Sequence, residues 1–223
     1  MGTIVTQDGW EYRITARDRI WAGRMAEHEG SRKAASLWCM TWYFARRKHR
    51  FRTFADALLA YSQPINPRWR RDGVFCRPGG EWHGTDYCSE VRLQRRDRAQ
   101  QLSWGELSPE TRRAVEKWMS GQLKNPVPRA MQFAAPGVAR RWMERNPGSR
   151  VFRLDNWYIV PPETQGLPKD WVKVRGEGGA LFLPLLFAGG LVAGAWWWKR
   201  RRARGARLRG VAQLSRHAFR SMG

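Results

Sequence analysis

A run of twenty-one uncharged residues, Gly178 to Trp198, constrains the fold more than any other part of the sequence. At about 1.5 Å of rise per residue, a helix of this length matches the roughly 30 Å hydrocarbon core of a bilayer. Three tryptophans end the run and a cluster of basic residues follows, as at a membrane–water interface. A buried helix of a soluble protein is the alternative, but its glycines and one proline would weaken it in water. We therefore predict one transmembrane helix over residues 178–198.

The charge beside this run predicts its direction. Residues 199–223 contain nine Lys and Arg and no Asp or Glu. Because cytoplasmic flanks carry such charge, we predict a basic cytoplasmic tail, a linker over residues 161–177 and a head domain, residues 1–160, on the outer, periplasmic side. The first 19 residues lack the apolar core and cleavage site of a signal peptide. Delivery of the head within a phage particle, with phage particle proteins as partners, and a head that stays cytoplasmic therefore remain alternatives.

The head and linker are strongly basic as well. Residues 1–177 carry 32 Lys and Arg against 19 Asp and Glu. Net charge reports on association and not on fold, so it indicates an anionic partner: nucleic acid, an acidic cell-wall polymer or lipid headgroups. The length suits one domain with a sizeable core.

Apolar periodicity and capping residues predict a mainly α-helical domain with a small β element. Helices are expected over residues 17–29, 32–48, 51–60, 89–101, 108–121 and 138–145, with short strands over 130–135 and 151–160. The helix over 32–48 is apolar nearly all round, so we expect it at the centre of the core. Pro64 and Pro67 interrupt regular backbone after the third helix.

Three cysteines occur, at positions 39, 76 and 88. Cys39 lies in the apolar helix and fits a buried thiol. Cys76 and Cys88 bracket a loop that closes as a disulfide in an oxidising compartment. Two free thiols, or a zinc site that includes His83, are the alternatives, although the spacing matches no structural zinc pattern well. We predict neither a metal nor a cofactor.

The common catalytic motifs of nucleophilic, zinc and nucleotide-dependent enzymes are absent from the sequence. The remaining candidate is Glu27, which follows Ile20 by seven residues and therefore shares its helix face, toward the core. Desolvation there would raise the pKa of the carboxyl and suit it to donate a proton to a glycosidic oxygen. A surface ion pair with Arg24 or Lys33 is the alternative.

Several short motifs occur in an order that resembles the SleB-like cell-wall hydrolase family of lysozyme-like enzymes. They are Ala26-Glu-His-Glu-Gly30, SLWCMTWYFARR, FRTFADALLAYSQPINPRW, the segment from Gly121 through Asn125-Pro126 to Phe133, and VFRLDNWYIV. The resemblance covers about residues 17–160. Two departures are Ala45 where the family tends to have Asn, and an insert from Arg68 to Trp104 without a family counterpart.

The resemblance implies a lysozyme-like α+β fold and a hydrolase, a glycosidase of cell wall degradation, with a phage as one source; the predicted span would hold it at a membrane. It implies that Glu27 is the general acid toward peptidoglycan, and that Ser62, Gln63 and Asn66 line the glycan groove. Attack by water would make the enzyme a muramidase, and attack by the substrate's own hydroxyl a lytic transglycosylase. Glu29 and Asp56 are candidate second carboxylates.

Tryptophans offer a further way to bind sugar rings. Trp69, Trp82 and Trp157 can stack on them, although each is equally suited to a core. The competing hypothesis for the whole protein is a membrane-anchored scaffold without catalysis, whose basic surface binds nucleic acid or anionic lipid. Under the peptidoglycan hypothesis the expected partners are peptidoglycan and the membrane, and nucleic acid is a less favoured partner.

Overall fold

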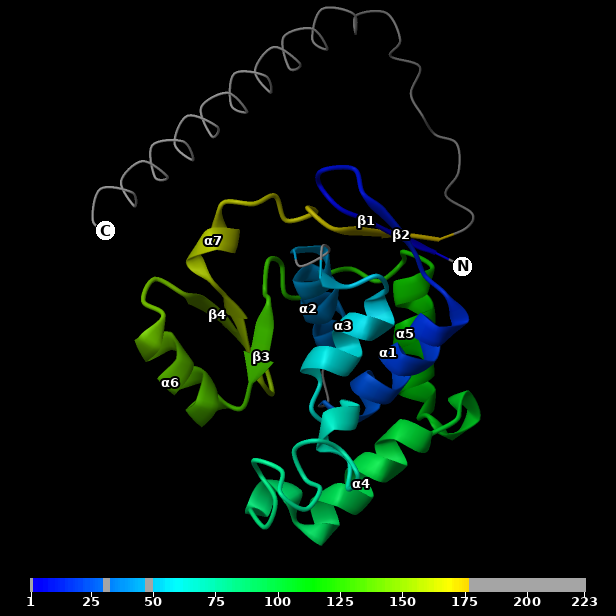
Figure 1. The fold of residues 1–223 in the computed structure, drawn as a ribbon. Helices are drawn as coiled ribbons and strands as arrows, with labels where there is room; N and C mark the ends of the chain where they lie inside the picture. The colour runs from blue at the N-terminus through cyan, green and yellow to red at the C-terminus, as the bar shows by residue number, and fades with distance from the viewer. Residues whose placement is uncertain (1, 30–32, 47–49, 177–223) are drawn as a thin grey trace, which may run out of the picture. The chain divides into compact units, whose positions relative to one another are not determined.

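The computed structural model describes residues 2–29, 33–46 and 50–176, which all belong to one compact unit (Figure 1). Its α-helices are α1 (Ala16–His28), α2 (Lys33–Arg46), α3 (Phe54–Tyr61), α4 (Glu90–Gln101), α5 (Pro109–Met119), α6 (Pro136–Arg145) and α7 (Pro162–Gln165). Short 3-10 helices are η2 (Pro67–Trp69), η3 (Asp86–Cys88) and η4 (Trp104–Glu106). Its strands are β1 (Thr3–Val5), β2 (Glu11–Arg13), β3 (Gln132–Ala134), β4 (Arg150–Arg153), β5 (Trp157–Val160) and β6 (Lys173–Arg175).

The first helix begins at a complete capping box. Thr15 accepts a hydrogen bond from the backbone N–H of Asp18, and the Asp18 carboxylate accepts one from the N–H of Thr15 at 2.8 Å. These bonds satisfy backbone groups that a helix start would otherwise leave without partners. The buried Asp18 also accepts a 2.7 Å hydrogen bond from the N–H of Ala55, so the same carboxylate joins α1 to the start of α3.

Helix α2 lies at the centre of the core, as its composition predicts. Eleven of its residues are buried, including Trp42 and Phe44, and it packs against α1, α3, α5 and β3. Trp118 of α5 is fully buried; its indole N–H donates a 3.1 Å hydrogen bond to Thr41 Oγ1, and its ring lies 4.7 Å from that of Phe54. Apolar burial of this kind supplies most of the free energy of folding.

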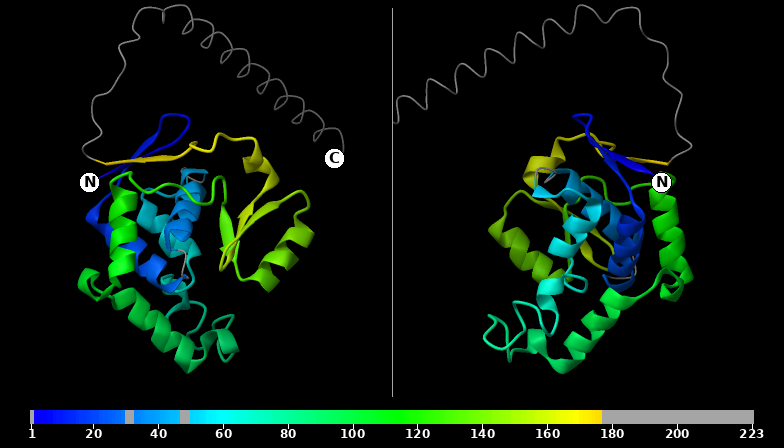
Figure 2. Two further views of the ribbon diagram at one scale, coloured as in Figure 1. Left: turned by 180° about the vertical axis from the view of Figure 1, so that it is seen from behind. Right: turned by 45° about the vertical axis from the view of Figure 1, so that its right-hand side comes forward.

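Two small antiparallel sheets flank the helices. One has the strand order β3-β5-β4 and carries α6, and it lies beside α2 (Figures 1 and 2). The predicted strand over 151–160 is in fact a hairpin: Phe152 pairs with Tyr158 across a tight connection in which the N–H of Leu154 bonds to the carbonyl of Asn156. The described residues therefore form a mixed fold of helices and small sheets, compatible with the expected α+β class.

The second sheet, β2-β1-β6, joins the beginning of the described chain to its end. Ile4 of β1 pairs with Val174 of β6, and both side chains are buried. Gly121, with φ of 71°, follows α5 and lies so close to the carbonyl of Val174 that a Cβ atom would collide with it. The linker predicted over 161–177 is therefore wrong for residues 161–175, which form α7, β6 and part of the core.

No helix within the described residues has the length and apolar character that crossing a bilayer requires. The predicted span, residues 178–198, and the basic tail, residues 199–223, lie outside the described residues.

Candidate active site

Glu29 directly follows α1 as its C-terminal cap, and its side chain meets the loop after α3. The hydroxyl of Ser62, itself the cap of α3, donates a 2.6 Å hydrogen bond to Glu29 Oε1. Ser62 is 1% exposed, whereas Glu29 keeps part of its surface in contact with solvent. The ends of two helices thus bring a hydroxyl and a partly accessible carboxyl together.

The β4–β5 hairpin contacts the backbone of the same residue, Glu29. The Asn156 side chain donates a 3.2 Å hydrogen bond to the backbone carbonyl of Glu29. Two residues further on, the hydroxyl of Tyr158 lies 3.3 Å from that of Ser36. Burial raises the pKa of Tyr158 to about 12, and the negative charges of Asp155 and Glu29 add to the shift.

Glu27 lies in the last turn of α1, two residues before Glu29, and has different neighbours. Its Oε2 accepts hydrogen bonds from the Ser108 hydroxyl at 2.9 Å, from the Ser108 N–H at 3.2 Å and from the Thr111 hydroxyl. The ammonium of Lys33 lies 3.3 Å away and also donates to Ser108 and Thr111. Glu27 therefore ties α1 to α2 and to the start of α5.

The two glutamates consequently have pKa values shifted in opposite directions. Burial raises the pKa of Glu29, and the Ser62 hydrogen bond and the charge of Arg95 offset only part of that rise. Burial also acts to raise the pKa of Glu27, but the hydrogen bonds from Thr111 and Ser108, with the charge of Lys33, outweigh it and leave the pKa below its ordinary value. The predicted rise in the pKa of Glu27 is therefore wrong. The alternative ion pair with Lys33 is present, and the sequence did not reveal the further donors Ser108 and Thr111.

Of the residues expected to line a glycan groove, Ser62 is the one that contacts the candidate carboxyl. Gln63 is half-buried in the same loop. Asn66 is 6% exposed, and both ends of its amide bond backbone: Nδ2 donates to the Ala60 carbonyl at 3.0 Å and Oδ1 accepts from the Arg68 N–H at 2.9 Å. Its side chain shapes the loop.

Trp157 lies on β5, where alternation turns it to the sheet face opposite Tyr158. Its ring is covered by the guanidinium groups of Arg153, 4.9 Å from the ring centre, and Arg140, 5.4 Å away. The structure therefore does not bring Trp157 together with Ser62 and Glu29.

Asp56, one of the expected second carboxylates, lies at the far end of α1. It pairs at 3.0 Å with Arg17, in the first turn of that helix, while Glu29 follows the last turn. Asp155, in the hairpin connection, is a carboxylate nearer to Glu29 that the sequence analysis did not single out. Its only sequence signal is its place within the VFRLDNWYIV motif.

Cys76 and Cys88 form a disulfide with a Cα–Cα distance of 5.5 Å, and Cys39 is a buried free thiol. The bond removes both thiolates that the zinc alternative would need. Within the described parts of the chain, no group of three His, Cys, Asp or Glu side chains is arranged to hold a metal ion.

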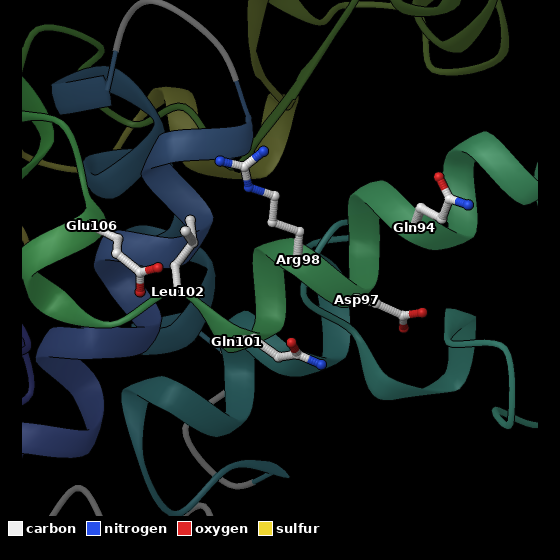
Figure 3. A pocket seen from close by; sticks show the side chains of 6 residues that line it. All are labelled: Gln94, Asp97, Arg98, Gln101, Leu102 and Glu106. Carbon is white, nitrogen blue, oxygen red and sulfur yellow. The ribbon is translucent and has the colours of Figure 1, made fainter.

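Two surface pockets lie away from the glutamates. One, of about 450 Å³, runs along α4 and is lined by Gln94, Asp97, Arg98, Gln101, Leu102 and Glu106 (Figure 3). The other, of about 260 Å³, lies between the turn after β1 and residues 168–175. Neither has Glu27 or Glu29 in its described lining, so the candidate site is defined by the Glu29–Ser62 pair.

Comparison with known proteins adds no relative: no family model, no curated protein and no solved structure matches this chain.

Proposed function

We propose that this protein is a peptidoglycan-cleaving glycosidase, a muramidase or lytic transglycosylase with a lysozyme-like arrangement, and that Glu29 is its general acid. The observation that carries the proposal is a partly accessible carboxyl with a raised pKa, hydrogen-bonded by a buried serine. A general acid must hold its proton near the working pH, and burial provides this for a glutamate. Glu27, whose pKa is lowered, is the poorer candidate for the role that the family resemblance implies.

In this mechanism the protonated Glu29 donates its proton to the glycosidic oxygen between N-acetylmuramic acid and N-acetylglucosamine as the bond breaks. The resulting carboxylate stabilises the positive charge that develops on the sugar ring. The Ser62 hydroxyl holds the carboxyl in one orientation and donates to it in its charged form. The second step is attack by water or by the muramic acid's own hydroxyl. Membrane attachment through residues 178–198 would keep this reaction close to the inner face of the wall.

Release of muropeptides from purified sacculi tests the assignment. Glu29→Gln should abolish release, because an amide cannot donate the proton, while the variant stays folded. Glu27→Gln is the matched comparison, and it should retain release when assayed at a temperature where it remains folded. An active Glu29→Gln variant would contradict the assignment of Glu29 as the general acid. Mass spectrometry of the products identifies the second step, since an anhydromuramic end marks transglycosylation.

One observation favours a second function, binding of a polyanion by a scaffold without catalysis. Residues 129–157 contain six arginines and two acidic residues. Arg140 and Arg153 lie over the Trp157 ring, and the described residues provide neither with a carboxylate partner. This function requires DNA or anionic-lipid binding that weakens steeply with salt. DNA or lipid binding that does not change with salt, together with cleavage of sacculi by the protein, would exclude this second function.

A further inference from the structure

The insert from Arg68 to Trp104 carries a cluster of four aromatic rings, here called the insert cluster: Trp69, Phe75, Trp82 and Tyr87. Trp69 is central, with its ring centre 4.8 Å from that of Phe75, 5.9 Å from that of Trp82 and 6.1 Å from that of Tyr87. Trp82 and Tyr87 meet edge to face at 5.2 Å. Such contacts fix the rings relative to one another.

The cluster differs from the aromatic core because none of its rings is fully buried. Trp69, Phe75 and Trp82 are half-buried and Tyr87 is 46% exposed, whereas Trp42 and Trp118 of the core are inaccessible. Within the described residues, neither the indole N–H of Trp82 nor the hydroxyl of Tyr87 makes a hydrogen bond. Trp82 therefore offers an apolar surface and a polar group to a ligand. The Arg92 guanidinium lies over the Tyr87 ring, 5.3 Å from its centre, so Tyr87 offers its other face and its hydroxyl.

Covalent and polar bonds hold this exposed surface rigid. The Cys76–Cys88 disulfide closes the loop that carries Trp82 and Tyr87. The buried Arg96 donates a 3.3 Å hydrogen bond to the Trp69 carbonyl, and backbone bonds tie Trp82 to Phe75. A preformed aromatic surface binds with a smaller loss of conformational entropy than a flexible one.

The cluster is also continuous with the candidate active site. Asn66 caps η2, which contains Trp69, and the same short loop begins at Ser62, the partner of Glu29. In Figure 1 the insert, with α4, lies below the ends of the helices, and the β3-β5-β4 sheet lies to one side of them. A polymer held at Glu29 can thus extend toward the insert.

We propose that Trp82 and Tyr87 of the insert cluster form a binding platform for N-acetylated sugar rings of the glycan strand, outside the position where the bond is cleaved. The proposal rests on the proposed function, because it takes the glycan strand as the ligand. Aromatic faces bind the C–H surface of a pyranose ring, while the indole N–H and phenol hydroxyl are free to bond its polar groups.

The insert is basic, with eight arginines and five acidic residues over positions 68–104. Arg71 makes a two-pronged ion pair with Glu90, at 2.6 and 2.5 Å, and Arg92 pairs with Asp86 at 2.9 Å. Arg71 and Arg92 are thus paired with carboxylates, whereas Arg68, 4.3 Å from the centre of the Phe75 ring, and Arg96, 5.0 Å from that of Trp69, have no carboxylate partner among the described residues.

Co-sedimentation of the full chain with insoluble peptidoglycan tests the platform. The assay uses the Glu29→Gln background, so that substrate is not consumed. The double change Trp82→Ala and Tyr87→Ala should weaken binding about tenfold, and Trp82→Phe, which keeps a ring, should lose much less. Trp10→Ala is the matched control, because Trp10 is 59% exposed but lies beside β2, in the other sheet. Near-ultraviolet circular dichroism checks that each variant is folded.

The outcomes separate this inference from the proposed function. Unchanged binding by the folded double variant overturns the platform even if wild type digests sacculi. Weakened binding together with an inactive wild type supports the platform and counts against the glycosidase. Binding that salt or competing DNA abolishes would assign the insert to a polyanion and overturn the sugar assignment.

Discussion

The Ser62 hydroxyl lies 2.6 Å from Glu29 Oε1 and donates a hydrogen bond to it. This bond favours the charged carboxylate and opposes the effect of burial on the pKa of Glu29. Ser62→Ala should therefore raise that pKa further, at a cost of about 1 kcal/mol in stability. Nuclear magnetic resonance titration of the Glu29 side chain measures the shift without relying on activity. A pKa that stays the same or falls would contradict the expected role of the hydroxyl.

Replacing Glu29 should change how stability depends on pH. A carboxyl whose pKa is raised by folding binds its proton more tightly in the folded state, so stability falls as pH rises from the ordinary glutamate pKa through the raised one. Glu29→Gln removes this loss. The variant should be more stable than wild type at neutral pH and equal to it at low pH. Thermal unfolding between about pH 4 and pH 8 tests this, and a less stable variant at neutral pH would refute it.

Replacing Glu27 should change the pH dependence of stability in the opposite direction. Its lowered pKa means that it stabilises the fold above the ordinary glutamate pKa, and that this contribution is lost as pH falls through the lowered value. Glu27→Gln leaves the partly buried Lys33 with only the exposed Glu110 carboxylate, at 3.9 Å, so we expect a loss of about 1–3 kcal/mol at neutral pH that shrinks on acidification. Chemical denaturation measures it. Glu116→Gln is the control, since its exposed pair with Arg19 contributes at most about 1 kcal/mol.

A substitution in β6 tests whether residues 161–175 belong to the domain. Val174→Asp puts a charge opposite the buried Ile4 and should cost about 2–4 kcal/mol. The neighbouring Lys173→Ala, on the exposed side of the strand, should have little effect. The midpoint of thermal unfolding distinguishes the two. Equal midpoints would mean that β6 adds little to the stability of the fold.

Local signals in the sequence were sufficient for most of the helices. Thr15 with Asp18 and Ser108 with Pro109 mark helix starts within a few residues, and the apolar run of α2 identifies the central helix. The β2-β1-β6 sheet had no comparable signal. Each of its strands has three residues, and Ile4 meets Val174 only after the whole domain has folded.

The sequence motifs centred the candidate site on Glu27, whereas the site that we propose centres on Glu29, the C-terminal cap of the same helix. Helical periodicity placed Glu27 on the core-facing side with Ile20, but both side chains are only partly buried. The ion pair with Lys33, which the sequence offered as the alternative, is present, and Ser108 and Thr111 join it at the same carboxylate. The Ser62–Glu29 contact depends on how the ends of α1 and α3 meet. That arrangement is a property of tertiary packing and is not encoded in the spacing of either motif.

The pairing of β6 with β1 has a mechanical consequence. Any pull on the chain beyond residue 176 reaches the domain through β6, an edge strand whose ladder hydrogen bonds all go to β1. The close approach of Gly121 to Val174 seats this strand against the end of α5. A pulling force would therefore act on the three-residue ladder between β6 and β1, which joins the beginning and the end of the described domain. The Glu29–Ser62 contact lies on other elements.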